Sequence, residues 1–480
     1  MRAVLLTLCM AGAASAAPYD TSGIADWAAV PKPTVEHPFK PPVARRAKLP
    51  NGISVLVVEN HELPIVSMAL VAPGAGTAYD PKDKPGVAAF TADMLDEGAG
   101  GLSAIQIAQE EARLGANIAL GAGVDAARVS VSTLTATLDP TIDLLAKTLA
   151  KPTFDPSDFD RVAGDRATAL ELRRDRPREV AAIMLGATLF GIDTPYGHPG
   201  AGLRASFKSI ALPDLQAFYA EHWNPATMTL VVAGDVDTAK VMAKLGTALG
   251  AWKAPGAKVV RVAASPLKVD RRLQLVDRAN APQSDVRIGL VGLDRKDRRY
   301  YAFEVMANAL GGGFTSRLNQ RLREQLGITY GAGASMDWRL APGPFSISTA
   351  IVAAETAHGI AEALKIVDDL AANDVPAAEL DKAKQNLIRA LPAQFETNTR
   401  TAASFAELAL HGLPDDWYAH YADQVRRVTA ADVRAVAKSA IPSGRLVIAV
   451  VGDMGKVRGE LDKLGLGEPV MHDLYGVPNP

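Results

Sequence analysis

The sequence predicts an α+β fold made of two homologous halves. Of its 480 residues, 48% are hydrophobic and 22% charged, a composition that can build more than one hydrophobic core. Helical and strand-like stretches mix without the regular alternation of a doubly wound sheet. Leu230–Asp235 and Leu446–Asp453 share an apolar strand that ends in Gly-Asp and precedes a lysine-bearing helix. Thr137–Arg166 and Thr356–Asn386 share a helix followed by an acidic-basic helix, so we expect an internal duplication.

The N-terminal segment has the features of a secretory signal peptide. A positive charge precedes an apolar run at 3–12, and the small residues Ala14–Ala16 would allow cleavage. We therefore expect a signal peptide at 1–16 and a proline-rich arm at 17–45. The single cysteine, Cys9, lies within the signal, so the mature chain would have no thiol for disulfides or cysteine catalysis. These features predict a periplasmic protein.

In the first half, turn residues and periodicity mark the elements. Asn51-Gly52 predicts a turn into a β-branched strand, and Ile65–Ala72 predicts a second strand. A helix is expected at Pro85–Leu95, and alternation at Ala119–Leu134 indicates further strands.

The domain boundaries follow from a change in composition. The stretch 252–272 combines prolines and glycine with basic residues, which is typical of a linker. It would separate a half at 46–251 from a half at 273–480. The net charge of −2 indicates neither nucleic acid nor an anionic membrane surface as a partner. No apolar run after the signal approaches the ~20 residues of a membrane span.

The most informative run is 311–330. Three glycines precede a helix that Gly327 would end, and a strand-like stretch follows. Spaced at i, i+4 and i+8, three leucines predict one buried stripe on that helix: Leu318, Leu322 and Leu326. Arg323 lies beside this stripe, and Tyr330 follows seven residues later. From the residues alone, Arg323 could equally form a surface ion pair, and Tyr330 could be an ordinary strand aromatic.

This run resembles the C-terminal half of the inverted-zincin peptidases, the family of pitrilysin, insulysin and the mitochondrial processing peptidase. In that family an Arg and a Tyr seven residues apart hold the substrate backbone beside a zinc ion, and Arg323 and Tyr330 match them. The resemblance extends from about Arg46 to the C-terminus. It implies two homologous halves joined by a linker, each made of two similar α+β domains, in a clam-shell arrangement.

The zinc motif that the resemblance implies is degenerate. Catalytic members carry H-x-x-E-H on the first helix, where two His bind zinc and the Glu activates water. The matching positions are Ala89, Ala92 and Asp93, and Glu171 stands where a further ligand is expected. Two carboxylates could hold at most a hard cation weakly, so we expect no metal in this chain. We interpret Glu171 as one acid of a charged helix, with three possible arginine partners: Arg166, Arg173 and Arg174.

A degenerate metal helix beside an intact Arg/Tyr pair predicts a non-catalytic, substrate-binding subunit of a heterodimeric zinc metallopeptidase. In some family members one chain supplies H-x-x-E-H and its homologue supplies the Arg/Tyr pair. We therefore expect a homologous partner that carries zinc and the general base, and peptide substrates. The alternative is a catalytically silent structural, peptide-binding or chaperone-like homologue with no role in proteolysis. A self-sufficient peptidase is disfavoured because two ligands and the base are absent together.

Overall fold

A computed structural model describes most of the chain. The described residues are 39–253, 262–263, 266–267 and 272–479. The predicted signal peptide at 1–16 lies outside them, as do most of the arm at 17–45 and most of the linker at 252–272. Within the described residues, the first regular element is strand β1, Arg45–Lys48. In this described part, none of the helices combines the length and the apolar character needed to cross a bilayer.

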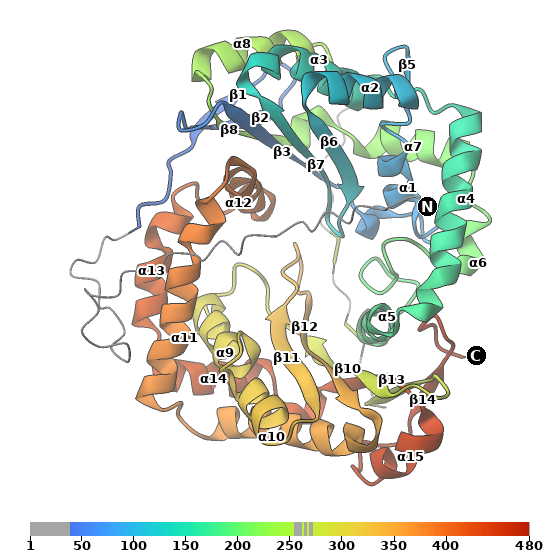
Figure 1. Cartoon of the computed structure of the whole chain (residues 1–480), viewed down its shortest axis with the longest axis vertical. Coiled ribbons are helices and arrows are strands. Elements are labelled where there is room, and N and C mark those ends of the chain that lie inside the picture. The colour runs from blue at the N-terminus through green and yellow to red at the C-terminus, as the bar shows by residue number, and fades with distance from the viewer. Residues whose placement is uncertain (1–38, 254–261, 264–265, 268–271, 480) are drawn as a thin grey trace, which may run out of the picture. The chain divides into compact units, whose positions relative to one another are not determined.

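The first half is built on one six-stranded sheet with the strand order β1-β2-β8-β3-β7-β6 (Figure 1). β2 and β8 are parallel, and the other neighbours are antiparallel. β8 is buried along nearly its whole length, which explains its continuous apolar sequence. The other strands are β2 Ser54–Glu59, β3 Ile65–Pro73, β6 Asn117–Ala122, β7 Ala126–Leu134 and β8 Thr229–Gly234.

Helices of the same half pack with this sheet into one hydrophobic core. Figure 1 shows α2, α3 and α8 on one side of the sheet. A short hairpin of β4, Gly98–Ala99, and β5, Leu102–Ser103, precedes α2. The helices are α1 Val87–Asp93, α2 Ala104–Leu114, α3 Leu138–Ala150, α4 Pro156–Leu172, α6 Arg204–Phe207, α7 Leu212–His222 and α8 Thr238–Leu249.

The second half repeats this plan around a second six-stranded sheet, ordered β11-β12-β10-β13-β9-β14. Its strands are β9 Leu273–Asp277, β10 Gln283–Val291, β11 Thr329–Met336, β12 Pro344–Val352, β13 Val447–Gly452 and β14 Val470–His472. Its α-helices are α9 Tyr300–Gly311, α10 Thr356–Ala372, α11 Ala377–Ala390, α13 Trp417–Arg427, α14 Ala430–Ala440 and α15 Met454–Asp462.

The strand pairing confirms the predicted duplication and the α+β class. The run β2-β8-β3-β7-β6 corresponds in order and direction to β9-β13-β10-β12-β11. The two Gly-Asp segments are the equivalent strands β8 and β13, and α3–α4 corresponds to α10–α11. The expectation of two domains in each half is wrong. In the described part, each half has one large sheet, and its helices share the core of that sheet.

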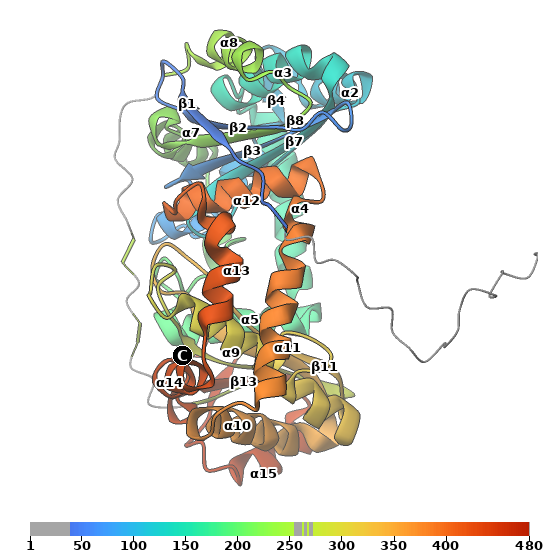
Figure 2. The same ribbon diagram turned by 90° about the vertical axis from the view of Figure 1, so that its left-hand side faces the viewer.

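The two halves exchange one helix each. α5, Pro177–Phe190, comes from the first half but packs on β10 and β13 of the second sheet, where Met184 and Leu185 join a core with Val447 and Ala449. α12, Asn398–His411, comes from the second half and lies against β3 and β8 (Figure 2). The Asn398 side chain donates to the carbonyl oxygen of Ile65 at 2.9 Å. Each sheet is therefore completed by the other half.

A buried carboxylate also joins the halves. Asp125, between β6 and β7, accepts a hydrogen bond from the Tyr196 hydroxyl at 2.6 Å and from the backbone N–H of Leu340 at 2.8 Å. Leu340 lies in the loop between β11 and β12. Asp125 is 7% exposed, so water cannot readily replace it as the acceptor for these two donors.

We expect Asp125→Ala to lower the free energy of unfolding by about 2–4 kcal/mol, because the buried Tyr196 hydroxyl and the half-buried N–H of Leu340 lose the Asp125 carboxylate as an acceptor. The measurement is urea denaturation followed by tryptophan fluorescence. Asp381→Ala, an exposed change on α11, is the control and should stay within about 0.5 kcal/mol of the parent. Equal effects of the two substitutions would contradict a stabilising role for Asp125.

Candidate functional site

The run 311–330 folds into the predicted loop, helix, stop and strand. Residues 317–325 are helical, and Asn319–Gln325 adopt the wider π-helical geometry, in which the Leu326 N–H donates to the carbonyl oxygen of Arg321 at 3.0 Å. Two leucines of the predicted stripe are fully buried and the third packs against the same core: Leu318, Leu322 and Leu326. Gly327 ends the helix with φ +66°.

Asn319 fastens this helix to the sheet, and the sequence analysis missed it. Its side-chain oxygen accepts from the N–H of Ala332 at 2.9 Å, and its amide donates to the carbonyl oxygens of Ala332 at 2.8 Å and Gly313 at 2.9 Å. The amide thus pairs with the edge strand β11 as a neighbouring strand would. One signal was available in the sequence, namely a polar residue directly after the buried Leu318. A buried amide needs several hydrogen-bond partners, so Asn319 was a candidate to join neighbouring segments.

The start of β11 is irregular, and this irregularity exposes Tyr330. The register with β12 shifts between Thr329 and Ala332. The Thr329 hydroxyl bonds to both the N–H and the carbonyl of Gly331, at 3.1 and 3.0 Å, which stabilises the irregularity. Tyr330 is left 85% exposed. Such bulges commonly redirect a side chain beside a binding site.

The structure brings Arg323 and Tyr330 together. The Arg323 guanidinium lies 5.7 Å from the centre of the Tyr330 ring and 4.5 Å from that of Phe314. Stacking on ring faces leaves the in-plane N–H groups available to an acceptor. The surface ion pair also exists, because Arg323 lies 3.5 Å from a carboxylate oxygen of Glu324. That separation is longer than a good hydrogen bond, so Glu324 does not satisfy the guanidinium.

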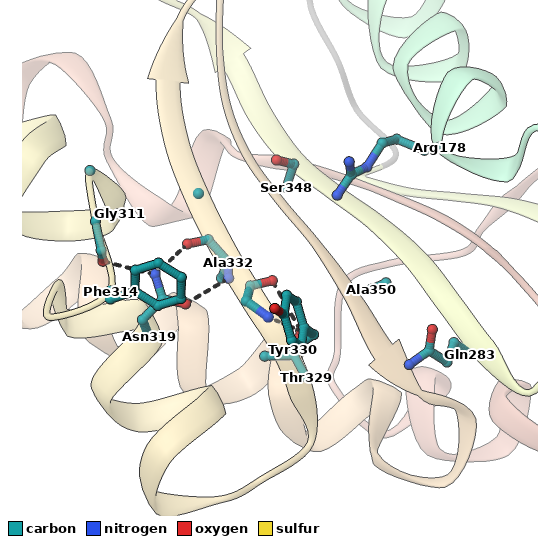
Figure 3. Close-up of a pocket in the computed structure, with 14 residues that line it drawn as sticks. Arg178, Gln283, Gly311, Phe314, Asn319, Thr329, Tyr330, Ala332, Ser348 and Ala350 are labelled. Atoms are coloured by element: carbon teal, nitrogen blue, oxygen red, sulfur yellow. Dashed lines mark hydrogen bonds between the residues drawn. The ribbon is translucent and has the colours of Figure 1, made fainter. Parts of the chain in front are cut away.

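A groove of about 460 Å³ opens beside Tyr330, and Arg323 is not among its lining residues (Figure 3). Its size is that of an ordinary ligand-binding pocket. Arg178 from α5 reaches it from the first half, while Phe314 and Tyr330 lie on its other side. The lining residues are Arg178, Gln283, Gly311–Phe314, Asn319, Thr329–Gly333, Ser348 and Ala350.

The positions that match the zinc motif do not fit a zinc ion. Ala92 is fully buried, and its methyl group, like that of Ala89, offers no lone pair. Asp93 is engaged in a close ion pair with Arg166, whose guanidinium also lies 5.2 Å from the Phe90 ring centre. In the part of the chain that the structure describes, no three His, Cys, Asp or Glu side chains converge on one point.

Glu171 is not brought to Asp93. It accepts from the Tyr475 hydroxyl at 2.9 Å and pairs with Arg204 at 2.7 Å, and these partners hold the pKa of its carboxyl below the usual value. The pocket of about 420 Å³ at Asp93 is lined by Ala169 and not by Glu171.

The arginine contacts expected for Glu171 are therefore wrong. Arg166 contacts Asp93 and Arg173 contacts Glu179. Arg174 lies beside Asp175, at 3.8 Å, and acts on Glu171 only at longer range. The true partners, Arg204 and Tyr475, are distant in sequence, so local helical spacing could not predict them.

Comparisons with known proteins agree with this geometry. The family described as "Insulinase (Peptidase family M16)" matches residues 54–194, and "Peptidase M16 inactive domain" matches residues 209–387. The chain belongs to peptidase family M16. This confirms the resemblance to the inverted zincins.

Three relatives of this M16 chain illustrate the family. An uncharacterized zinc protease of Mycobacterium bovis is 27% identical over 423 residues, or 86% of this chain and 94% of that protein. The non-peptidase homolog YmxG of Helicobacter pylori is 24% identical over 412 residues, or 86% and 93%. The crystal structure of a peptidase M16 inactive domain from Pseudomonas fluorescens superposes with a TM-score of 0.79 at 26% identity, covering 85% of this chain and 98% of that one. With its degenerate motif, the chain is a catalytically inactive member of the M16 family.

The degenerate helix α1 is held at its start by a buried acid. Gly86 has φ +108° and is not helical, so the helix begins at Val87, two residues later than predicted. The Asp80 carboxylate accepts from the N–H groups of Gly86 and Ala88, both at 2.7 Å. Burial nevertheless raises the pKa of Asp80 to about 7. His198 lies 3.9 Å away, and burial lowers its pKa, so the neutral imidazole is favoured there.

Asp80 should make stability depend on pH. Its folded pKa, about 7, lies above its unfolded value, so its contribution is fully present below about pH 4 and is lost as pH rises through 7. From pH 5 to pH 8, we expect the urea midpoint of the parent to fall relative to the urea midpoint of Asp80→Asn. Each protein is measured at the same ionic strength, and Asp381→Asn is the control. A difference independent of pH would contradict the raised pKa.

Proposed function

We propose that this chain is the non-catalytic, substrate-binding subunit of a heterodimeric zinc metallopeptidase. Its partner would be a homologous M16 chain that carries H-x-x-E-H. Zinc and the general base would belong to that partner, and peptides would be the substrates. The predicted signal peptide adds the periplasm as the compartment.

The observation that carries this proposal is the contrast between the two motif sites of the chain. At the metal-helix position, Asp93 is neutralised by Arg166 and no ligand set remains. At the other site, Arg323 lies against the exposed Tyr330 ring, and Tyr330 lines a groove. A chain of this kind can hold a peptide but needs another chain for the chemistry.

Arg323 and Tyr330 would act on the peptide backbone. The in-plane N–H groups of Arg323 would donate to the carbonyl oxygen of the bond to be cleaved, and the Tyr330 hydroxyl would donate to the same region. Donors placed where negative charge develops lower the barrier to carbonyl addition. Phe314 and Tyr330 fix the plane of the guanidinium, so less side-chain freedom is lost on binding.

An extended peptide could also pair with a sheet edge. On β11, Asn319 already occupies the N–H and carbonyl of Ala332, so a peptide cannot pair there. The groove beside β11 would therefore contact a peptide through its side chains and not through backbone pairing at Ala332.

The alternative is a catalytically silent homologue with a structural, peptide-binding or chaperone-like role. The name of the Helicobacter pylori relative, a non-peptidase homolog, is compatible with it. The two functions differ in one measurable respect. Mixing with an H-x-x-E-H homologue produces peptide cleavage only if the chain contributes to an active site.

The chain alone should contain no stoichiometric zinc after dialysis and should cleave no peptide. Co-expression with an H-x-x-E-H homologue from the same organism should give a complex that cleaves fluorogenic peptides. Zinc content is measured by plasma emission spectrometry, and cleavage by fluorescence. Chelator-sensitive cleavage by the chain alone would contradict the proposal, and an inactive complex would favour the structural alternative.

In that complex, Arg323→Ala should lower kcat by about 10²-fold, because one donor to the developing oxyanion is lost. Tyr330→Phe should lower it by about tenfold, since only the hydroxyl is removed. Gel filtration should show the complex intact, because both side chains are outside the core. Arg426→Ala, which removes an exposed arginine of α13, is the control. Unchanged rates for Arg323→Ala would return Arg323 to the role of a surface ion-pair residue.

A further inference from the structure

The groove beside Tyr330 has a floor of small and polar residues. β12 alternates strictly, with Phe345, Ile347 and Ile351 buried in the main core and Ser348 and Ala350 partly exposed on the opposite face. Gly333 of β11 pairs with Ser348, so it shares that face. A side chain is therefore missing where the floor meets the edge strand.

α5 leaves this floor open. It packs on β10 and β13, and at Gly289 of β10 an added Cβ would come within 2.9 Å of Leu185. Beyond β10, the lining from β12 and β11 is Ser348, Ala350 and Thr329–Gly333. The first turn of α5 carries Arg178, which extends from the helix toward Ser348 (Figure 3).

Arg178 brings the only permanent charge to the lining of the groove. Apart from the weakly acidic Tyr330, the other lining residues cannot titrate. The neighbouring arginines, Arg176 and Arg278, each have a carboxylate partner at 3.6 Å. Within the described ranges, Arg178 has no such partner.

The charges on β10, next to the floor, leave an excess of positive charge at this end. Asp285 and Arg287 lie on the groove-side face of β10. Arg287 pairs in register with Ser348, toward which Arg178 extends, so the two cations lie near one another (Figure 3). Burial lowers the pKa of Arg287, and the charge of Arg178 lowers it further. Asp285 is the one carboxylate between them, and burial raises its pKa. One acid therefore faces two arginines.

We propose that this end of the groove binds a carboxylate of an extended peptide, with Arg178 as the residue that selects it. The carboxylate could be an Asp or Glu side chain or a free C-terminus. Guanidinium is suited to this role because it can donate two parallel hydrogen bonds to one carboxylate. The inference rests on the proposed peptide-binding role of the groove. It adds a preference for acidic peptides to that role.

The test uses the full chain and labelled peptides. Nine-residue fluorescein peptides of Ser, Thr and Val carry one Asp or Asn at a scanned position, with a free or an amidated C-terminus. Fluorescence polarisation measures their Kd at 50 and 300 mM NaCl. At low salt we expect the acidic member of the best pair to bind about fivefold more tightly, and we expect salt to reduce this ratio.

The substitutions separate charge from geometry. Arg178→Ala should bring the ratio to about one, Arg178→Lys should keep part of it, and Arg178→Glu should favour Asn over Asp. Arg174→Ala removes the same charge nearby, outside the groove, and should leave the ratio unchanged. Circular dichroism should be the same for all variants because Arg178 is exposed. A ratio that survives Arg178→Ala, or that is absent in the parent, overturns the inference.

The position of the peptide is tested at Gly333. An added Cβ there would lie 3.9 Å from both Gly311 and Ser348, so the fold can accept Gly333→Val. The new side chain would occupy the floor, and binding of every peptide should weaken by about tenfold or more. Unchanged binding would show that the peptides lie elsewhere and would overturn the inference.

Two comparisons identify the source of the carboxylate: Asp against Asn peptides, and free against amidated C-termini. A preference that amidation abolishes assigns the C-terminus, and one that follows the Asp position assigns a side chain. Failure here is distinct from failure of the proposed function. Cleavage by the complex with no Arg178-dependent preference refutes this inference alone. An inactive complex with an intact preference refutes only the catalytic role.

Discussion

The exchange of α5 and α12 between the halves is the constraint on which the rest of the structure depends. Each six-stranded sheet has helices of its own half in its core and needs a helix of the other half on its remaining face. Burial of apolar surface therefore couples the two halves, because separating them would expose both sheets. The same exchange positions the groove. α5 covers β10 and β13, and its first turn carries Arg178 to the groove beside β11 and β12.

At the positions that match the zinc motif, an arginine neutralises the remaining acid. The Asp93 carboxylate, at the end of α1, needs a positive charge nearby. Arg166 of α4 supplies that charge to Asp93 and stacks on Phe90. Arg204 and Tyr475 satisfy Glu171 in a separate network. Asp93 and Glu171 therefore each have an arginine partner of their own.

Most of the fold could be predicted from local signals. The strands at 54–59 and 65–73, the helix with the leucine stripe and the duplication all follow from periodicity and turn residues. The number of domains in each half could not, because amphipathic helices do not reveal which sheet they cover. The helix exchange could not be predicted for the same reason, because nothing in the sequences of α5 and α12 indicates which sheet each helix covers.

The candidate site was expected from the family resemblance, but its geometry was not. The resemblance pointed to Arg323 and Tyr330, whereas their approach depends on Phe314, on the bulge at Thr329 and on the hydrogen bonds of Asn319. Those contacts join segments that local patterns treat separately. For the same reason the sequence analysis missed Arg178, which lies 145 residues before Arg323 and reaches the groove only through the exchange of α5.

The stability of the fold does not explain the arrangement around Tyr330. Phe314 is 63% exposed and Tyr330 is 85% exposed, so neither ring contributes the burial that usually places an aromatic residue. The π-helical turn that carries Arg323 is a rare geometry that occurs frequently at functional sites. Exposed rings, a stacked guanidinium without a good carboxylate partner and an open groove are what peptide binding requires. A purely structural homologue has no physical need for this combination, which favours a substrate-binding role over a remnant.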